Sequence, residues 1–135
     1  MDHTRRIFLI DDEHLNNFIN TKMITRFLPY EVTAFTRAVE ALESLKTLQD
    51  PALLPEVIFL DINMPEMDGW QFLQAYSQLD DRIHRHCNIV VLSSSIDIRD
   101  IERAKSFKVV REFISKPLSA ENLRFIAESG ILKSA

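Results

Sequence analysis

Four short apolar segments of the chain each end in a polar side chain of a kind that binds metals or phosphate. The side chains that follow these segments are Asp11 with Asp12, Asp61, Ser93 and Lys116. Carboxylate oxygens are ligands that suit Mg²⁺, and a hydroxyl and an ammonium can bind phosphoryl oxygens. If one fold brings these side chains together, they form a site for a magnesium ion and a phosphoryl group.

The segments that carry these side chains are typical of strands in a parallel sheet that is buried on both faces. They span residues 7–10, 57–60, 89–92 and 109–115, and a weaker strand is predicted at residues 31–35. Ligands of open parallel sheets bind at the carboxyl ends of the strands. We therefore expect the polar side chains to meet at one edge of the sheet.

Helical patterns, with apolar residues three and four apart, alternate with the predicted strands. They cover residues 15–27, 38–48, 69–79, 97–107 and a segment that begins at Ser119, whereas residues 50–55 and 80–88 are predicted to be loops. The first helix is expected to bury an apolar face made of Leu15, Phe18, Ile19, Met23 and Phe27. Right-handed crossovers then give an α/β, doubly wound, three-layer sandwich of five strands and five helices.

Composition limits the classes of function. The chain of 135 residues fits one domain, which we place at residues 1–129, followed by a short tail at 130–135. A net charge of −4 argues against nucleic acid or an anionic membrane as partner, and two glycines are too few for a glycine-rich phosphate loop. Cys87 is the single cysteine, and the first residues carry no signal-peptide pattern, so we expect a cytoplasmic protein.

Three aspartates at one edge would repel one another, and a divalent cation would relieve that repulsion. Asp11 and Asp12 could instead cap the following helix, but Asp61 ends an apolar strand, where it has no stabilising role. An aspartate can also attack phosphorus and form an acyl phosphate. Lys116 would then supply positive charge to the transferred group, and Ser93 or Ser94 would supply a hydroxyl.

The segment from Phe59 to Gly69, with Asp61 and Pro65, resembles the phosphoacceptor loop of two-component receiver domains. The other markers of that family follow in its order: the acidic pair Asp11-Asp12, Ser93, Phe113 and Lys116-Pro117. The resemblance covers residues 5–127 and implies a flavodoxin-like sheet with strand order 2-1-3-4-5.

The resemblance also implies a role for each marker. Asp61 would be the phosphorylated residue. Asp12 and Asp61, with the main-chain carbonyl of Asn63, would bind Mg²⁺ directly, and Asp11 would act through water. Lys116 would pair with Asp61 and then with the phosphoryl group. Ser93 would be the switch hydroxyl, with Ser94 as the other candidate, and Phe113 would be the switch aromatic.

We therefore expect a stand-alone bacterial response regulator that catalyses its own phosphorylation and dephosphorylation, rather than a conventional enzyme. Its donor would be a sensor histidine kinase or a histidine phosphotransfer protein, and it would switch a surface that binds a downstream protein. Two alternatives stay open. One is a phosphorelay intermediate that passes the group onward, and the other is an interaction domain that works without phosphorylation.

Overall fold

Five parallel strands form the centre of the molecule. The computed structural model describes residues 4–94 and 97–132. The strands pair in the order β2-β1-β3-β4-β5, which confirms the predicted sheet. Their bounds are β1 (Arg6–Ile10), β2 (Glu31–Phe35), β3 (Val57–Asp61), β4 (Asn88–Ser93) and β5 (Val110–Ser115).

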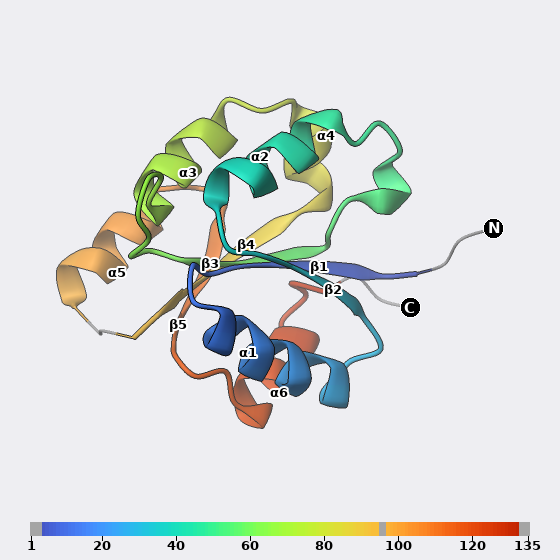
Figure 1. Cartoon of the computed structure of the whole chain (residues 1–135), viewed down its shortest axis with the longest axis vertical. Helices are drawn as coiled ribbons and strands as arrows, with labels where there is room; N and C mark the ends of the chain where they lie inside the picture. Colours follow the sequence, from blue (N-terminus) through green and yellow to red (C-terminus); the bar gives the residue numbers. More distant parts are fainter. Residues whose placement is uncertain (1–3, 95–96, 133–135) are drawn as a thin grey trace.

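Helices cover both faces of the sheet, with α2, α3 and α4 on one face and α1 and α6 on the other (Figure 1). Ala104 of α5 packs into the core shared with α2 and α3, so α5 belongs to that same layer. Among these helices, none is both long and apolar enough to cross a bilayer. The helices are α1 (His14–Phe27), α2 (Ala38–Thr47), the 3₁₀ turn η1 (Pro51–Leu53), α3 (Gly69–Ser77), α4 (Asp81–His86), α5 (Ile98–Lys105) and α6 (Ala120–Glu128).

Two hydrophobic cores lie on opposite faces of the sheet because successive side chains of a strand point to opposite sides. In β1, Phe8 and Ile10 pack under α2 and α3, whereas Ile7 and Leu9 pack against α1 and α6. β3 is buried over its whole length, including Asp61. The sheet therefore fixes the polar residues at its strand ends rigidly.

Two segments that we predicted to be loops contain helical turns. Asp80 caps α4 by accepting a hydrogen bond from the main-chain N–H of Arg82, and Ile83 anchors the helix in the core. Asp50 caps η1 in the same way, and Pro51 stands at its first position, where a missing N–H costs nothing. Short capped helices of this kind carry too little apolar periodicity to be recognised from sequence.

The predicted buried face of α1 is wrong. Leu15 is 66% exposed, Phe18 61% and Phe27 49%, and Ile19 is exposed as well. Of the predicted set, only Met23 packs partly against the core. The residues that α1 buries are Asn17, Asn20 and Ile24. The helix is thus rotated so that two amide side chains face the sheet and most of its large apolar side chains face outward.

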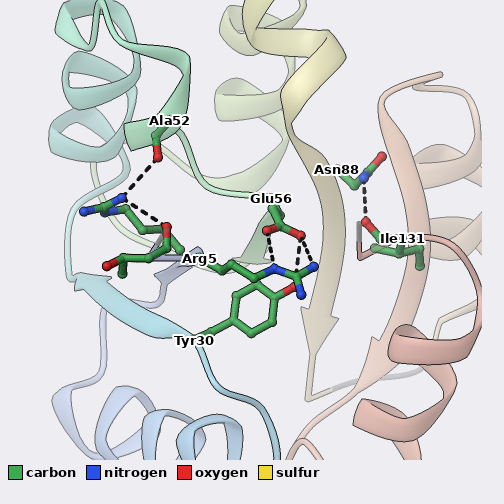
Figure 2. A network of polar contacts seen from close by, with 8 residues as sticks. Arg5, Tyr30, Ala52, Glu56, Asn88 and Ile131 are labelled. Carbon is green, nitrogen blue, oxygen red and sulfur yellow. Dashed lines mark hydrogen bonds and ion pairs between the residues drawn. The ribbon is translucent and has the colours of Figure 1, made fainter. Parts of the chain in front are cut away.

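A polar network ties together the amino ends of the strands, opposite the edge where the aspartates lie. The Arg5 guanidinium donates to both carboxylate oxygens of Glu56 at 2.8 and 3.0 Å, and the Tyr30 hydroxyl donates to Glu56 at 2.9 Å (Figure 2). Nearby, the Asn88 amide donates to the carbonyl of Ile131 and holds the end of the chain against β4 (Figure 2). Arg5, Tyr30 and Glu56 directly precede β1, β2 and β3, and Asn88 begins β4. Their hydrogen bonds therefore hold the first residues of these strands in place.

Candidate functional site

The three aspartates meet at the carboxyl edge of the sheet, as the sequence predicted. Asp11 follows β1, Asp61 ends β3, and one carboxylate oxygen from each of Asp11, Asp12 and Asp61 lies within 4.8 Å of the others. Asp11 and Asp61 are buried, whereas Asp12 is half-buried. The cluster is therefore shielded from solvent on the strand side and open toward Asp12.

Lys116 extends into this cluster from the end of β5. Its Nζ donates to Asp11 Oδ2 at 2.5 Å and lies 3.3 Å from Asp61 Oδ1, so it bridges both carboxylates and sits nearer to Asp11. The Lys116 main-chain N–H donates to the carbonyl of Ser93, and the Lys116-Pro117 peptide is cis. The bond to β4 fixes the lysine main chain beside the carboxylates.

The pKa of Asp61 reflects its burial and the charges of its two neighbours, Lys116 and Asp11. Burial raises this pKa, the Lys116 charge lowers it, and the Asp11 charge raises it again, so that the pKa comes to about 6. The carboxyl also accepts a hydrogen bond from the main chain of Asn63. For Lys116, burial acts to lower the pKa, but the hydrogen bond to Asp11 and the charge of Asp61 outweigh it and hold that pKa above its usual value.

These residues fit a magnesium ion. Three carboxylates face one ammonium, so the cluster keeps an excess of negative charge that a divalent cation would neutralise. Asp11 is already engaged, because its Oδ1 accepts from the Glu13 N–H and its Oδ2 accepts from Lys116. Asp12 and Asp61 are the other two carboxylates of the cluster and the remaining candidates to hold the ion.

The remaining predicted site residues surround the cluster at different depths. Ser93 is buried at the end of β4, whereas Ser94 is exposed, and Ser95 lies outside the described residues. Asn63 is exposed in the loop after β3, two residues beyond Asp61. Phe113 is half-buried on β5 and borders a surface pocket with residues of α5 and β5.

The loop from β3 to α3 is held in place at two points. The Gly69 N–H donates to the carbonyl of Ile62, and a Cβ at Gly69 would lie only 2.7 Å from the Asp61 carbonyl oxygen. On the outer rim, Arg37 donates twice to Glu66, whose φ of 69° is unusual for a residue other than glycine. The loop thus follows one path beside Asp61.

Sequence reasoning missed Asn17 and Asn20 of α1. The Asn17 amide donates to the carbonyl of Asp11 at 2.8 Å, and Asn20 accepts from the main-chain N–H of Leu118 at 3.4 Å. Asn17, Asn20 and Ile24 recur at intervals of three and four residues, which is the signal of a helix face. A stripe that carries two amides is usually the exposed face of a helix, so this spacing alone does not show that the face is buried.

An aromatic and basic cluster joins α3 to α5 near the site. The Arg103 guanidinium lies 4.5 Å from the centre of the Trp70 ring, and Trp70 stacks on Phe107 with ring centres 6.4 Å apart. Trp70 is the second residue of α3, directly after the loop that Asp61 begins. The cluster therefore connects that loop to α5.

Comparison with known proteins identifies the family. The sequence profile of the response regulator receiver domain matches residues 7–128. The chain belongs to the response regulator receiver domain family. A solved two-component response regulator from Cytophaga hutchinsonii is 30% identical with a TM-score of 0.87, and the match covers 98% of this receiver domain and all of that chain. A receiver protein from Dyadobacter fermentans is 26% identical with a TM-score of 0.83, over 93% of this chain and 97% of the other.

Curated relatives include receiver segments within much larger proteins. Hybrid signal transduction histidine kinase B of Dictyostelium discoideum is 25% identical over 87% of this chain, which spans only 6% of that protein. A probable methanogenesis regulatory protein of Methanothrix harundinacea is 30% identical over 90% of this chain, and the match covers 78% of that protein. Membership of this family implies a histidine kinase as partner of the receiver domain, and its acidic triad is consistent with a metal site.

Proposed function

We propose that this receiver domain accepts a phosphoryl group on Asp61 from a phosphohistidine donor, with Mg²⁺ held by Asp12, Asp61 and the main-chain carbonyl of Asn63. The modified form then binds a downstream protein. The observation that carries the proposal is the cluster of the buried Asp11 and Asp61 with the half-buried Asp12, in which Lys116 bridges the two buried carboxylates. A shielded aspartate with an ammonium beside it is suited to act as a nucleophile and to stabilise the product.

The transfer follows from the groups present. A carboxylate oxygen of Asp61 attacks phosphorus, the bond from phosphorus to the donor imidazole nitrogen breaks, and that nitrogen takes up a proton. Lys116, 3.3 Å from Asp61, supplies positive charge to the phosphoryl oxygens as they approach. When bound, Mg²⁺ adds further positive charge at those oxygens. Later, water attacks phosphorus, the bond from phosphorus to the Asp61 oxygen breaks, and inorganic phosphate leaves the free carboxylate of Asp61.

The response to phosphorylation is assigned to Ser93 and Phe113. Phosphorylation replaces the single charge of the Asp61 carboxylate with a phosphoryl group that carries about two negative charges and three acceptor oxygens. Ser93 ends β4, the strand paired with β3, and directly follows Leu92, which is the residue in register with Asp61. A new hydrogen bond there would shift the start of α5, and the half-buried Phe113 on β5 would follow into the space vacated.

The test is intact-protein mass spectrometry after incubation with acetyl phosphate, with and without Mg²⁺. We expect a gain of one phosphoryl group that requires Mg²⁺ and is absent from Asp61→Asn. A folded protein that gains no group from acetyl phosphate or from a phosphorylated histidine kinase would favour the alternative of an interaction domain that works without phosphorylation.

The exposed apolar face of α1 supports a protein as phosphodonor. It begins next to Asp11 and Asp12, and basic side chains border it, with Lys22 over the Phe18 ring and Arg26 over the Phe27 ring. An apolar surface rimmed by cations suits a partner helix that has apolar residues and acidic neighbours. Docking there would bring a phosphohistidine on that helix to the carboxylate cluster.

We therefore predict that Phe18→Ser slows phosphorylation by a histidine kinase or a phosphotransfer protein by about tenfold, since a buried aromatic at an interface is worth about 1–2 kcal/mol or more. Phosphorylation by acetyl phosphate should be unchanged, because that donor needs no docking surface. Ile98→Ser, at an equally exposed residue on α5, is the matched control. Equal rates of Phe18→Ser and the control with the protein donor would contradict this docking site.

The phosphorelay alternative uses the same surface and site. It differs in the fate of the group, which would pass from Asp61 to a histidine of a second protein. Incubating the phosphorylated protein with an unmodified histidine phosphotransfer protein, and following both by mass spectrometry, separates the two functions.

A further inference from the structure

The inner face of α1 presents buried amides where apolar side chains would pack better. Asn17 is 5% exposed and Asn20 2%, while Phe18 and Ile19 between them face solvent. Burying an amide costs free energy that only its hydrogen bonds can offset. Packing alone would favour the opposite rotation of the helix. The position of α1 therefore depends strongly on the bonds that Asn17 and Asn20 make.

Asn17 bonds to the residue that holds Lys116. Its Nδ2 donates to the Asp11 carbonyl at 2.8 Å and to the Phe35 carbonyl at 3.4 Å, while the Asp11 N–H donates to Phe35 at 3.0 Å. Both main-chain polar groups of Asp11 are thus fixed. The Asn17 Oδ1 is buried and has no hydrogen-bond partner in the part of the chain that the structure describes. The donor side of this amide is therefore what the fold uses.

The side chain of Asp11 links its fixed main chain to the reaction site. Its two carboxylate oxygens accept from the Glu13 N–H and from the Lys116 ammonium, so the side chain cannot rotate without losing one of them. Lys116 lies between Asp11 and Asp61. A shift of the Asp11 main chain would move the ammonium away from the phosphoryl acceptor.

We infer that Asn17 is a positioning residue for phosphoryl transfer, which fixes the main chain of Asp11 and thereby holds the Lys116 ammonium beside Asp61. This inference rests on the proposed function of Asp61. Asn17 itself touches neither the acceptor nor the donor. Because Lys116 acts on the transferring group, a loss of Asn17 should lower the maximal rate more than the affinity for the donor.

The test compares Asn17→Ala, Asn17→Leu and the matched control Asn16→Ala, each in the full chain. Leucine shares the branching of asparagine at Cγ but is larger and has no hydrogen-bond donor, so Asn17→Leu fills the space of the amide without its hydrogen bond. Asn16 is half-buried on the same helix, and its side chain makes no hydrogen bond within the described residues. Initial rates of Mg²⁺-dependent phosphorylation are measured over a range of acetyl phosphate concentrations, and thermal unfolding verifies the fold of each variant.

We expect both Asn17 variants to lose about tenfold in maximal rate, the size of effect that follows from one lost buried hydrogen bond, with the apparent KM for acetyl phosphate within about twofold of wild type. Asn16→Ala should match wild type. A loss in Asn17→Ala that Asn17→Leu restores would assign the effect to packing and overturn the inference. Wild-type rates in both Asn17 variants would also overturn it, while the proposed function stands.

A crystal structure of Asn17→Leu tests the positioning role of Asn17 independently of the proposed function of Asp61. If the wild-type protein gains no phosphoryl group, the proposed function fails, and the geometry of the variant then decides the inference. Lys116 displaced from Asp11 Oδ2 would support the positioning role of Asn17. An unchanged contact between Lys116 and Asp11 would overturn it.

Discussion

Asp61 lies at the end of β3 with 6% of its surface exposed, beside Asp11 and Asp12. Its pKa of about 6 means that the folded protein binds the proton of this carboxyl more tightly than the unfolded chain does. Asp61 therefore contributes most to stability below the ordinary aspartate pKa, and this contribution is lost as pH rises through about 6. The proposed acceptor residue therefore weakens the fold at neutral pH.

Asp61→Asn should therefore stabilise the protein at neutral pH. In EDTA at pH 7.5 we expect a gain of about 1–2 kcal/mol in the free energy of unfolding, since one pKa unit corresponds to about 1.4 kcal/mol and Asp61 is partly screened. At pH 4, where both side chains are neutral, the gain should vanish. Urea unfolding at both pH values measures this difference, and a gain of equal size at pH 4 would contradict an electrostatic cause.

The same pKa sets the pH dependence of magnesium binding. The ion needs an ionised Asp61, so its affinity should fall as pH drops below about 6, by up to about tenfold per pH unit. Titration calorimetry between pH 5 and 8 measures the affinity. Asp61→Asn should show weak binding without this step, and a flat profile in the wild type would contradict the prediction.

At the scale of helices and loops, the path from β3 to α3 decides where Asp61 points. Gly69 begins α3 against the main chain of Asp61 and Ile62, with no space for a Cβ. Gly69→Ala should cost about 1–3 kcal/mol, the range for overpacking, because the obstructing atoms are backbone atoms that cannot move aside easily. Mg²⁺ affinity should fall as well, because the loop beside Asp61 shifts.

Thermal unfolding and calorimetry check both effects of Gly69→Ala. Gly130→Ala offers a contrast, because its surroundings are open and its φ of 89° makes any loss a backbone effect. It should lower stability without changing Mg²⁺ affinity. Equal loss of metal affinity in the two variants would argue against a local role for Gly69.

The elements that the sequence predicts well are those whose position depends on burial. β3 is buried throughout and β4 is buried from Ile89 onward, and both are recognisable as apolar runs. Asp97 and Ser119 cap their helices as predicted. The prediction for α1 failed because the bond that Asn17 donates and the bond that Asn20 accepts outweigh apolar packing there. The sequence shows which residues share a helix face, but it does not show which polar face forms hydrogen bonds with the rest of the fold.

The site was predictable to the same extent as the strands. Asp11, Asp12, Asp61 and Lys116 converge because parallel strands end at one edge, which is a property of topology. The preference of Lys116 for Asp11 over Asp61 was not predicted. It depends on a difference between two side-chain distances, 2.5 Å to Asp11 and 3.3 Å to Asp61, which no spacing of residues encodes.

Across the whole molecule, the carboxyl and amino edges of the sheet contribute differently to stability and to the site. The carboxyl edge concentrates like charges around Asp61, whereas the amino edge pairs Arg5 with Glu56 and adds the Tyr30 hydroxyl. Burial and the bond to Glu56 raise the pKa of Tyr30 well above its usual value, so this hydroxyl stays protonated as a donor. The amino edge stabilises a fold that the carboxyl edge weakens.

Tyr30→Phe should lower the stability of the fold without changing the reaction site. Losing one buried hydrogen bond to Glu56 should lower the free energy of unfolding by about 1–2 kcal/mol. Phosphorylation by acetyl phosphate and Mg²⁺ affinity should not change at a temperature where the variant is folded, because the site lies at the opposite edge. Chemical unfolding measures the loss of stability, and mass spectrometry measures the rate of phosphorylation. Slower phosphorylation of the folded variant would contradict the prediction that the amino edge does not affect the site.

The contact between Trp70 and α5 gives the molecule an optical signal of its own. Trp70 is the single tryptophan of the chain, and its ring contacts Arg103 of α5 and Phe107, which lies just beyond that helix. Any displacement of α5 changes the polarity around the indole and the quenching of its excited state. Emission intensity, recorded without a label, would thus follow in real time how this helix responds to events at Asp61.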